Sequence, residues 1–540
     1  MKKNSKKYSY FLFLIILISV FWQCARRGSP TGGPKDEKPP VLLFAEPKSG
    51  VTQFNRNKVR LIFDEFVVIK DLRKQLIISP PMENFPIISP MSASKKLDIS
   101  ILDTLKPNTT YVFNFGSSIQ DYNEGNPYSD FKYVFSTGNF VDSLKIKGKI
   151  KDAYKSKPDN FVTIMLYEYN QNYKDSLVYK DKPTYVTNTL DSLETFELNY
   201  LRKGKYILVA LKDKNSNYRF DQKEDKIAFW NEPISVEDND TLPSYELTLF
   251  KEILNYKPAR PAQVSENRIS FGFEGSTDSV QIKPISPIKG DFKYIISKEP
   301  KKDTLNFWFS PKQSDSLLFA VQKSQKIDTF KVRLKNMKPD SLLISNSFSG
   351  ELPMGKNFAW KSNIPILKVD TTKIKVFDKD SLQLPFKTKL DKEKLEYSIL
   401  FDKKYSTSYR IEALPEAITD FFGNTNDTLR VNLKTKKLED YSILKLTIKK
   451  ELQFPVILQL TNEKGDKTES ELYFETAQKE YVFENINPGK YKIRIIEDKN
   501  KNKIWDTGNF LKRIQPERIL YYPNLLELRA NWEVEEVWDE

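Results

Sequence analysis

The stretch TFELNYLRKGKYILVALKDKNSNYRFD (Thr195–Asp221) decides the fold, because a second copy of it lies 285 residues further along the chain. The second copy is EYVFENINPGKYKIRIIEDKNKNKIWD (Glu480–Asp506), and the two align without gaps, with eight identities in 27 positions. In both copies an alternating run leads to Gly-Lys-Tyr, a second apolar run, and a stretch rich in Asp and Asn. Such alternation predicts strands that bury one face, so the repeated unit is expected to be a β-sandwich.

Most of the remaining chain shows the same two-residue period. Examples are KVRLIFDEF (Lys58–Phe66), TTYVFNF (Thr109–Phe115) and FVTIMLYEY (Phe161–Tyr169). Turn-forming residues recur at short spacing, and no long segment with a 3.6-residue period competes with them. The sequence therefore predicts an all-β protein, with short helices only at Ile69–Gln75 and Leu390–Glu396.

Length and composition bound the number of domains and the class of partner. A chain of 540 residues is too long for one hydrophobic core, so several domains are expected. Hydrophobic residues make up 39% and aromatic residues 13% of the chain, which is enough to build packed cores. The net charge is +14, but basic residues are spread among nearly as many acidic ones. Because a phosphate-binding surface needs a localised basic stripe, no nucleic-acid partner is predicted.

The residue types that are missing exclude most enzyme mechanisms. The chain has no histidine and a single cysteine, Cys24, which removes Ser-His-Asp and Cys-His catalysis, histidine-bound metals and intrachain disulfides. It also lacks a Gly-rich phosphate loop and a nucleophile elbow. The adjacent acids Asp64 and Glu65 would point to opposite faces of a strand, which does not suit acid/base work on one bond. No enzyme activity is expected.

Residues 1–23 have the pattern of an export signal. Four lysines among the first seven residues precede the apolar run FLFLIILISVFW (Phe11–Trp22). This run has 12 residues, of which 11 are apolar, and it falls short of the roughly 20 that cross a bilayer as a helix. The segment is therefore expected to be a signal peptide that is removed.

Cys24 follows this apolar run, and its placement resembles the lipobox of bacterial lipoproteins. The resemblance implies that Cys24 is acylated and becomes the mature N-terminus, with the Pro- and Gly-rich residues 24–38 as a flexible tether to the membrane. Ala25 takes the second position in place of aspartate, which resembles lipoproteins sorted to the outer membrane. Arg26 and Arg27 stand where some surface-exported lipoproteins carry acids, which favours the periplasmic face.

The first part of the folded chain carries a set of motifs in a fixed order. They are PPVLLFAEP, a strand ending in Asp-Glu, LKPNTTY, DYNEGN and a terminal FSTG. This order resembles the S-layer (SbsA)-type bacterial Ig-like domain, and the resemblance places such a domain at residues 39–139. A reduced copy, ITDFFGN (Ile418–Asn424) followed by NDTLRVNLKTK, implies a second Ig-like module at 361–437.

The repeated stretch resembles the transthyretin-like or carboxypeptidase-regulatory-like β-sandwich. The resemblance rests on Gly-x-Tyr, a strand and an Asp-rich loop in series, and it implies two such modules at residues 140–250 and 438–540. In that family these modules are non-enzymatic appendages. Residues 251–360 between them are expected to be β-rich, without a recognisable family.

The Asp-rich end of each copy offers side-chain oxygens at calcium-loop spacing. In the first copy oxygen-bearing residues fill positions one, three, five, nine and twelve: Asp213, Asn215, Asn217, Asp221 and Glu224. The second copy supplies four: Asp498, Asn500, Asn502 and Asp506.

A Ca²⁺ ion is the one cofactor that these loops predict, and an alternative stays open. Position six of the first loop is Tyr218, where calcium loops use glycine, and position twelve of the second is Asn509 in place of glutamate. The alternative is an Asx-turn loop, in which Asp and Asn side chains accept hydrogen bonds from nearby backbone amides.

Together these features predict a non-enzymatic, lipid-anchored protein of the outer membrane. Its tandem Ig-like and transthyretin-like β-sandwiches would act as a spacer or a protein-interaction scaffold, with an unidentified envelope protein as partner. The alternative is a surface-exposed protein that binds glycan or another cell, with the same modules as its stalk.

Overall fold

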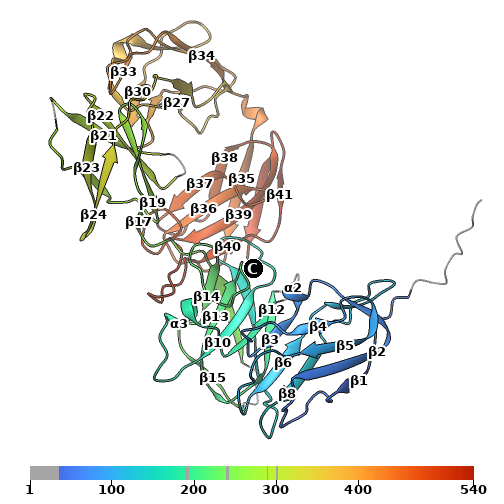
Figure 1. Cartoon of the computed structure of the whole chain (residues 1–540). Helices are drawn as coiled ribbons and strands as arrows, with labels where there is room; N and C mark the ends of the chain where they lie inside the picture. The colour runs from blue at the N-terminus through green and yellow to red at the C-terminus, as the bar shows by residue number, and fades with distance from the viewer. Residues whose placement is uncertain (1–35, 190–193, 239–242, 289, 300–301, 540) are drawn as a thin grey trace, which may run out of the picture. The chain divides into compact units, whose positions relative to one another are not determined.

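The computed structural model describes residues 36–189, 194–238, 243–288, 290–299 and 302–539, and its regular structure is almost entirely β (Figure 1). Over these residues each helix is a single turn: α2 (Leu72–Gln75), α3 (Leu177–Lys180), η1 (Thr371–Lys373) and η2 (Leu438–Asp440). The predicted fold class, tandem β-sandwiches, is confirmed. The chain divides into two compact units, residues 1–142 and 143–540.

The first unit contains one sandwich, which we call the first Ig-like module. One sheet has the order β1-β2-β5-β4 with β7 paired to β2, and the other has the order β3-β6-β8. Its core includes Leu61, Phe63, Phe113 and Phe135. The strands are β1 (Leu42–Glu46), β2 (Lys58–Ile69), β3 (Ile77–Ser79), β4 (Ile87–Ser89), β5 (Ser94–Ser100), β6 (Thr110–Asn114), β7 (Ile119–Asp121) and β8 (Lys132–Ser136).

The second unit begins with the first repeat module. One sheet has the order β11-β10-β13-β14 with β15 paired to β13, and the other has β12-β9-β16 with β16 parallel to β9. The strands are β9 (Leu144–Asp152), β10 (Thr163–Glu168), β11 (Tyr185–Asn188), β12 (Thr195–Leu201), β13 (Gly204–Lys212), β14 (Lys226–Phe229), β15 (Ile234–Val236) and β16 (Ser244–Leu249).

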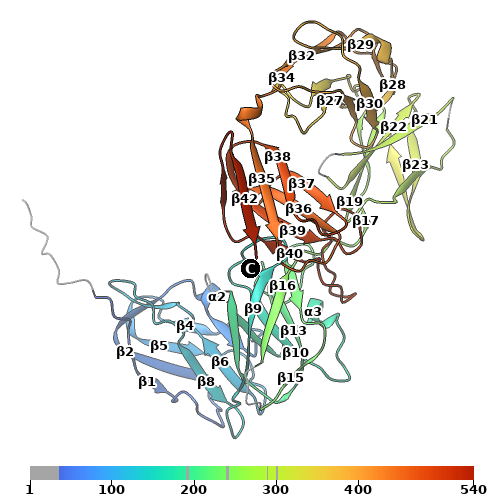
Figure 2. The same cartoon turned by 180° about the vertical axis from the view of Figure 1, so that it is seen from behind.

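The second repeat module has the same topology, strand for strand. Its sheets are β37-β36-β39-β40, with β41 paired to β39, and β38-β35-β42, with β42 parallel to β35 (Figure 2). The internal repeat predicted from the sequence is therefore also a repeat of the fold. The strands are β35 (Ser442–Ile448), β36 (Val456–Asn462), β37 (Thr468–Phe474), β38 (Tyr481–Ile486), β39 (Gly489–Glu497), β40 (Ile519–Tyr521), β41 (Leu526–Leu528) and β42 (Glu533–Trp538).

The shared Gly-x-Tyr step has one structural role in both copies. The Tyr206 hydroxyl donates to the Arg202 carbonyl at 2.9 Å, and the Tyr491 hydroxyl donates to the Asn487 carbonyl at 2.6 Å. Each ring lies over the glycine two residues earlier, where a Cβ would come within 3.3 Å of the hydroxyl in the first copy. Glycine is thus selected by the close approach of the tyrosine ring.

The middle module lies between the repeats and forms its own core around Phe271, Phe307 and Phe319. Its sheets are β17-β19-β22-β21, with β18 paired to β19, and β20-β23-β24. The strands are β17 (Lys257–Pro258), β18 (Ala262–Ser265), β19 (Arg268–Glu274), β20 (Gln281–Pro284), β21 (Lys293–Lys298), β22 (Thr304–Ser310), β23 (Ser316–Lys323) and β24 (Lys326–Arg333).

The second Ig-like module begins earlier than the 361 boundary suggested by the sequence. Its sheets are β25-β27-β31-β30, β26-β34-β32-β29 and β28-β33, and Ile344 in β25 already packs on their common core. The strands are β25 (Ile344–Asn346), β26 (Gly350–Glu351), β27 (Phe358–Ser362), β28 (Ile366–Val369), β29 (Ile374–Phe377), β30 (Lys387–Asp391), β31 (Glu396–Leu400), β32 (Ser408–Ala413), β33 (Ile418–Asp420) and β34 (Leu429–Lys434).

The helix predicted at Leu390–Glu396 is wrong, and the one at Ile69–Gln75 is shorter than predicted. Residues 390–396 form the end of β30, the turn at 392–395 and the start of β31. The Asp391 carboxylate accepts hydrogen bonds from the backbone amides of Glu393 (3.1 Å) and Lys394 (3.0 Å) in this turn. Such an Asx contact competes with helical hydrogen bonding. At the other site only α2 is helical, since β2 continues to Ile69.

Two sets of hydrogen bonds mark the first Ig-like module. The Tyr111 hydroxyl accepts from the backbone N–H of Lys106 (2.8 Å), and the Thr137 hydroxyl oxygen accepts from the N–H of Thr109 (2.9 Å). The Thr137 hydroxyl in turn donates to the Lys106 carbonyl at 2.7 Å. These contacts tie the LKPNTTY strand to the terminal FSTG, so both motifs serve the fold.

The second Ig-like module repeats these contacts 298 residues later. The Tyr409 hydroxyl accepts a hydrogen bond from the Lys404 N–H at 2.6 Å. The Thr435 hydroxyl accepts from the Thr407 N–H at 3.1 Å and donates to the Lys404 carbonyl at 2.6 Å. The front half of this module therefore forms the same set of hydrogen bonds, through the sequence KKYSTSY. In this stretch Lys404, Thr407 and Tyr409 match Lys106, Thr109 and Tyr111, and the residues between them differ.

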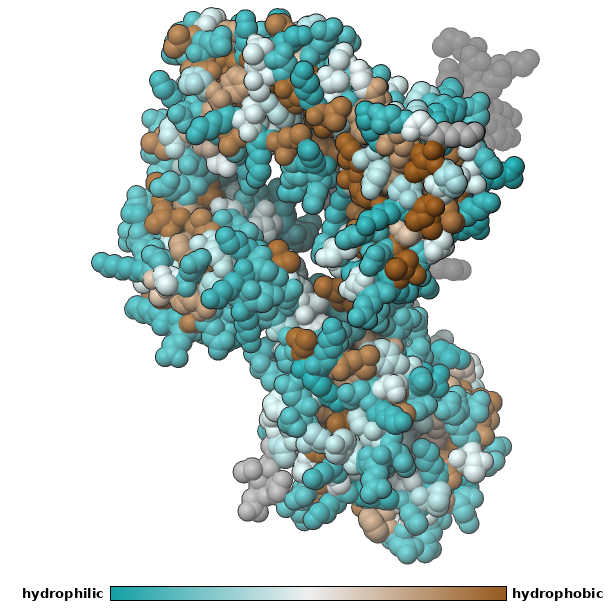
Figure 3. Space-filling view, turned by 90° about the vertical axis from the view of Figure 1, so that its left-hand side faces the viewer, coloured by the Kyte–Doolittle hydropathy of each residue, from teal (hydrophilic) through white to brown (hydrophobic). Residues whose placement is uncertain are grey.

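The surface of the described residues is mostly hydrophilic on the face shown in Figure 3, with apolar residues scattered among polar ones. Basic side chains alternate with acidic partners in exposed ion pairs such as Lys151–Glu246 (2.8 Å) and Lys445–Glu533. No helix in this part of the chain is both long and apolar enough to cross a membrane.

Candidate functional site

The first Asp-rich loop joins β13 to β14, and its predicted ligands accept hydrogen bonds from the loop's own backbone. The Asp213 carboxylate accepts from the N–H groups of Asn215 (3.2 Å) and Tyr218 (2.7 Å). The Asn217 side-chain oxygen accepts from the N–H of Arg219 at 2.8 Å. These are the contacts of Asx turns, the alternative that the sequence left open.

A buried acid that the sequence analysis did not select closes this loop. Asp225 is only 1% exposed, and its two carboxylate oxygens accept from the backbone N–H groups of Lys214 and Asp221, both at 2.9 Å. Its predicted neighbour, Glu224, is exposed and pairs with the Lys214 ammonium at 2.8 Å. The hydrogen bond from Lys214 lowers the pKa of Glu224. Spacing alone therefore does not identify Asp225, the acid that lies in the interior of the loop.

The second loop is closed by Glu517, from a different place in the sequence. Its carboxylate accepts from the backbone N–H groups of Lys499 (2.7 Å) and Asp506 (3.0 Å). These amides are the repeat counterparts of the two that Asp225 holds, but Glu517 lies 292 residues after Asp225, not 285. Glu517 is 6% exposed, and burial raises its pKa. A gapless alignment cannot find this correspondence.

The predicted ligands of the second loop also face one another and the backbone. The buried Asp498 carboxylate accepts from the N–H groups of Asn502 (3.1 Å) and Lys503 (2.9 Å). The side-chain amides of Asn500 and Asn502 both donate to the Asp506 carboxylate at 2.6 Å. The structure thus brings these four residues together, with the amide N–H groups of both asparagines directed at Asp506.

Calcium binding stays a prediction. Among the described residues, no group of three His, Cys, Asp or Glu side chains is placed to hold a metal ion. The backbone does adopt one feature of a calcium loop, because position six has a positive φ in both copies, 60° at Tyr218 and 66° at Lys503. A residue other than glycine therefore occupies the left-handed conformation there, at a cost that the Asx-turn hydrogen bonds offset.

Melting curves separate the two accounts of the loops. The calcium prediction requires a Ca²⁺ excess of about a hundredfold over Kd to stabilise the fold by about 2.7 kcal/mol. It also requires Asp213→Asn with Asp221→Asn to remove most of that gain, and Asp498→Asn with Asp506→Asn to remove less. Identical curves with Ca²⁺ and with chelator, measured by calorimetry on the full chain, would leave the Asx turns as the whole account.

The acids of the two Ig-like loops have a similar structural role. The buried Asp121 carboxylate accepts from the N–H groups of Glu124 (2.6 Å) and Asn126 (2.7 Å), and Asp420 accepts from that of Asn424 (2.8 Å). Burial raises the pKa of Asp121, but the backbone hydrogen bonds outweigh it, so the pKa lies below its ordinary value. Asp121 is thus held ionised as a loop anchor.

The Asp64 and Glu65 pair shows no arrangement for acid/base chemistry. Asp64 accepts a hydrogen bond from the Val41 N–H at 2.8 Å, which fastens the start of β1 to β2. Burial raises the pKa of Glu65, and the neighbouring acids Asp121 and Asp64 add to the rise.

A buried arginine joins the two repeat modules. Arg494 in β39 is only 3% exposed, and its guanidinium donates to the Tyr154 hydroxyl at 2.9 Å while lying 4.4 Å from the centre of that ring. The Tyr154 ring also packs on Trp505, with ring centroids 4.9 Å apart. Gln459 supplies the acceptor for the Arg494 Nε–H. The second repeat module therefore returns to pack on the first.

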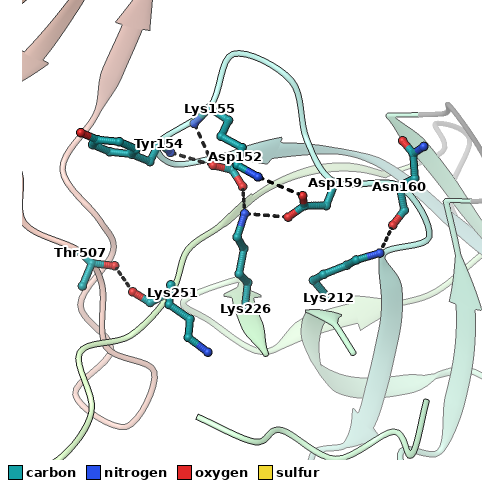
Figure 4. Close-up of polar contacts among 9 residues, drawn as sticks. All are labelled: Asp152, Tyr154, Lys155, Asp159, Asn160, Lys212, Lys226, Lys251 and Thr507. Atoms are coloured by element: carbon teal, nitrogen blue, oxygen red, sulfur yellow. Dashed lines mark hydrogen bonds and ion pairs between the residues drawn. The ribbon is translucent and has the colours of Figure 1, made fainter. Parts of the chain in front are cut away.

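The segment after the second Asp-rich loop extends this interface. The Thr507 hydroxyl donates to the Lys251 carbonyl at 2.7 Å (Figure 4). The Phe510 N–H donates to the buried Glu252 carboxylate, and the Phe510 ring meets the Phe229 ring edge-on at 5.4 Å. Such a mix of apolar and satisfied polar contacts is typical of a stable interface between domains.

The same part of the first repeat module contains an ion cluster. The Lys226 ammonium lies between the carboxylates of Asp152 (2.5 Å) and Asp159 (2.6 Å) (Figure 4). Burial lowers the pKa of Lys226, but its hydrogen bonds to the two acids outweigh this and raise the pKa. The two acids therefore favour the charged form of this lysine, which is neither a nucleophile nor a base.

Cys24, the predicted lipidation site, lies outside the described residues, and its acylation stays a prediction. The predicted signal peptide and most of the tether lie in the same segment. Membrane attachment is therefore a prediction from the sequence alone.

The fold defines a class, the tandem β-sandwich proteins with Ig-like domains. Residues 36–137 match the family described as bacterial Ig-like domain, in agreement with the domain predicted there. No curated protein matches the sequence.

Several solved structures resemble the chain at low sequence identity. The surface layer protein SbsC, domains 1–6, is 10% identical with a TM-score of 0.14, and the match covers 86% of this chain and 66% of that one. The major pilin subunit BcpA of Bacillus cereus is 10% identical with a TM-score of 0.13, covering 73% and 98%. The I9–I11 tandem from titin is 12% identical with a TM-score of 0.12, covering 52% and 100%.

Proposed function

We propose that this chain is a non-enzymatic, lipid-anchored envelope protein whose β-sandwiches form a spacer or protein-interaction scaffold at the outer membrane. The observation that carries the proposal is that the buried acids of its loops accept hydrogen bonds from the backbone of those loops. Asp225, Glu517 and Asp121 hold backbone amides in place, so the carboxylates best placed for chemistry serve the fold instead. The N-terminal sequence supplies the second part, since Cys24 follows an export signal.

The return of the second repeat module to the first supports a scaffold rather than a flexible string. Arg494 and Tyr154 are 340 residues apart in the sequence and form one buried contact. Chain contacts also join successive modules, through Lys223 and Glu274 (3.1 Å) and through Tyr405 and Asn485 (2.8 Å). Modules tied at both ends resist bending, which suits a protein that holds partners at a fixed spacing.

Protease treatment of intact cells tests the placement at the membrane. A scaffold on the periplasmic face is expected to stay uncut until the outer membrane is permeabilised, because protease cannot reach it. Immunoblotting of the full chain before and after permeabilisation measures this, with a known surface protein as positive control. Cleavage on intact cells would contradict the periplasmic placement and favour the alternative, a surface protein that binds glycan or another cell.

A further inference from the structure

A pocket of about 480 Å³ lies between the two repeat modules, and no contact described above explains it. The first repeat module lines it with Lys151, Trp230, Asn231 and Glu246, and the second adds the loop that holds Gln515 and Arg518. Its size is in the range of small-molecule sites, which lie preferentially at domain interfaces.

One wall of the pocket is an exposed tryptophan. Trp230 is 38% exposed, whereas Trp308, Trp360 and Trp538 are among the most fully buried side chains of the described residues. Its indole is held edge-to-face against Tyr245, with ring centroids 5.3 Å apart and an interplanar angle of 75°. The contact with Tyr245 fixes the orientation of an indole that lines the pocket and is partly open to solvent.

The loop that carries this tryptophan is held by the other module. The Gln515 side-chain amide donates to the Phe229 carbonyl (3.0 Å) and to the Asn231 side-chain oxygen (2.9 Å), the two residues on either side of Trp230. Two planar amide groups therefore lie beside the indole. Since they come from different modules, the pocket exists only when the modules are packed together.

The charges around the pocket disfavour an anionic ligand. Lys151 is paired with Glu246 at 2.8 Å, and Arg518 lies 3.6 Å from Glu497. Both basic side chains of the lining thus have an acidic partner, and Glu232 adds a further negative charge. A phosphate or carboxylate ligand would meet no excess of positive charge, so a neutral ligand fits this site best.

We propose that this pocket binds a neutral oligosaccharide, with one sugar ring stacked on Trp230 and its hydroxyl groups bonded to Asn231 and Gln515. A pyranose has an apolar face of C–H groups and a rim of hydroxyls, which match a flat aromatic ring beside planar amides. The inference goes beyond the scaffold role and does not depend on lipid anchoring.

Calorimetric titration of the full chain with neutral trisaccharides tests the proposal. The panel is cellotriose, maltotriose, mannotriose and chitotriose. At least one is expected to bind, and Trp230→Ala is expected to weaken that binding about tenfold. Trp230→Phe keeps an aromatic face and should retain most of the affinity. Trp532→Ala is the matched control, because Trp532 is 50% exposed in the second repeat module and lies outside the pocket.

Three results would overturn the proposal. One is the absence of binding for every trisaccharide at about 10 mM. Another is equal loss of affinity in the Trp230→Ala and Trp532→Ala variants, when both melt at the temperature of the unaltered chain. The third is binding of an uncharged tripeptide, Ala-Ala-Ala acetylated at its N-terminus and amidated at its C-terminus, that Trp230→Ala abolishes and with which no trisaccharide competes. That result would assign the pocket to peptide.

Discussion

Replacing Cys24 with serine is expected to abolish the incorporation of labelled palmitate and to move the chain from the membrane fraction to the soluble fraction. The thiol is the only group in the chain that can carry a diacylglycerol in thioether linkage. Stable anchoring needs two or more acyl chains, and a loss of all of them removes the attachment. The apolar run before Cys24 is too short to replace them as a membrane-spanning helix.

A second variant shows whether position matters or only the presence of a thiol. In the Cys24→Ser background, Ser29→Cys restores a cysteine five residues further along the tether. Lipidation that depends on the distance from the export signal should not return in this double variant. Palmitate labelling of Cys24→Ser itself, or its retention in membranes after a high-salt wash, would show that the lipoprotein hypothesis is wrong.

The repeat could be predicted from the sequence because its two copies keep glycine, tyrosine and aspartate where the backbone requires them. Gly204 and Gly489 admit the tyrosine ring, and Asp213 and Asp498 turn the loop. Each of these roles belongs to one residue type at a fixed distance along the chain. A gapless alignment therefore finds them, and the topology of the whole module follows.

Contacts between distant segments left no such pattern. Arg494 and Tyr154 meet across the module interface, but nothing in the sequence around either residue indicates a partner. The hydrogen bonds that tie the first half of the second Ig-like module to its last strand could not be predicted from the sequence for another reason. These hydrogen bonds use the backbone of Lys404 and Thr407, which any residue supplies, so Tyr409 and Thr435 are the side chains that the contacts require.

Asp225 and Glu517 close equivalent loops, but they do not lie at equivalent positions in the aligned repeats. Removing either acid is expected to destabilise its loop strongly. Glu517→Ala should leave the N–H groups of Lys499 and Asp506 without their acceptor inside a closed loop. A hydrogen bond to a charged group contributes about 1.5–3 kcal/mol, so the loss of both should destabilise the loop by about 3 kcal/mol. Asp225→Ala should do the same to the first loop, independently of the second.

Hydrogen exchange measures this directly, peptide by peptide, on the full chain. A loss of about 3 kcal/mol corresponds to exchange roughly a hundredfold faster in the segment 498–506, since each 1.4 kcal/mol is a factor of ten. Glu527→Ala is the control in the same module, because Glu527 is exposed and pairs only with Arg529 on the surface. Unchanged exchange at 498–506 in Glu517→Ala would contradict the assigned role. The expected increase, seen without added Ca²⁺, would mean that a protein carboxylate holds this loop closed and that its conformation does not require a metal ion.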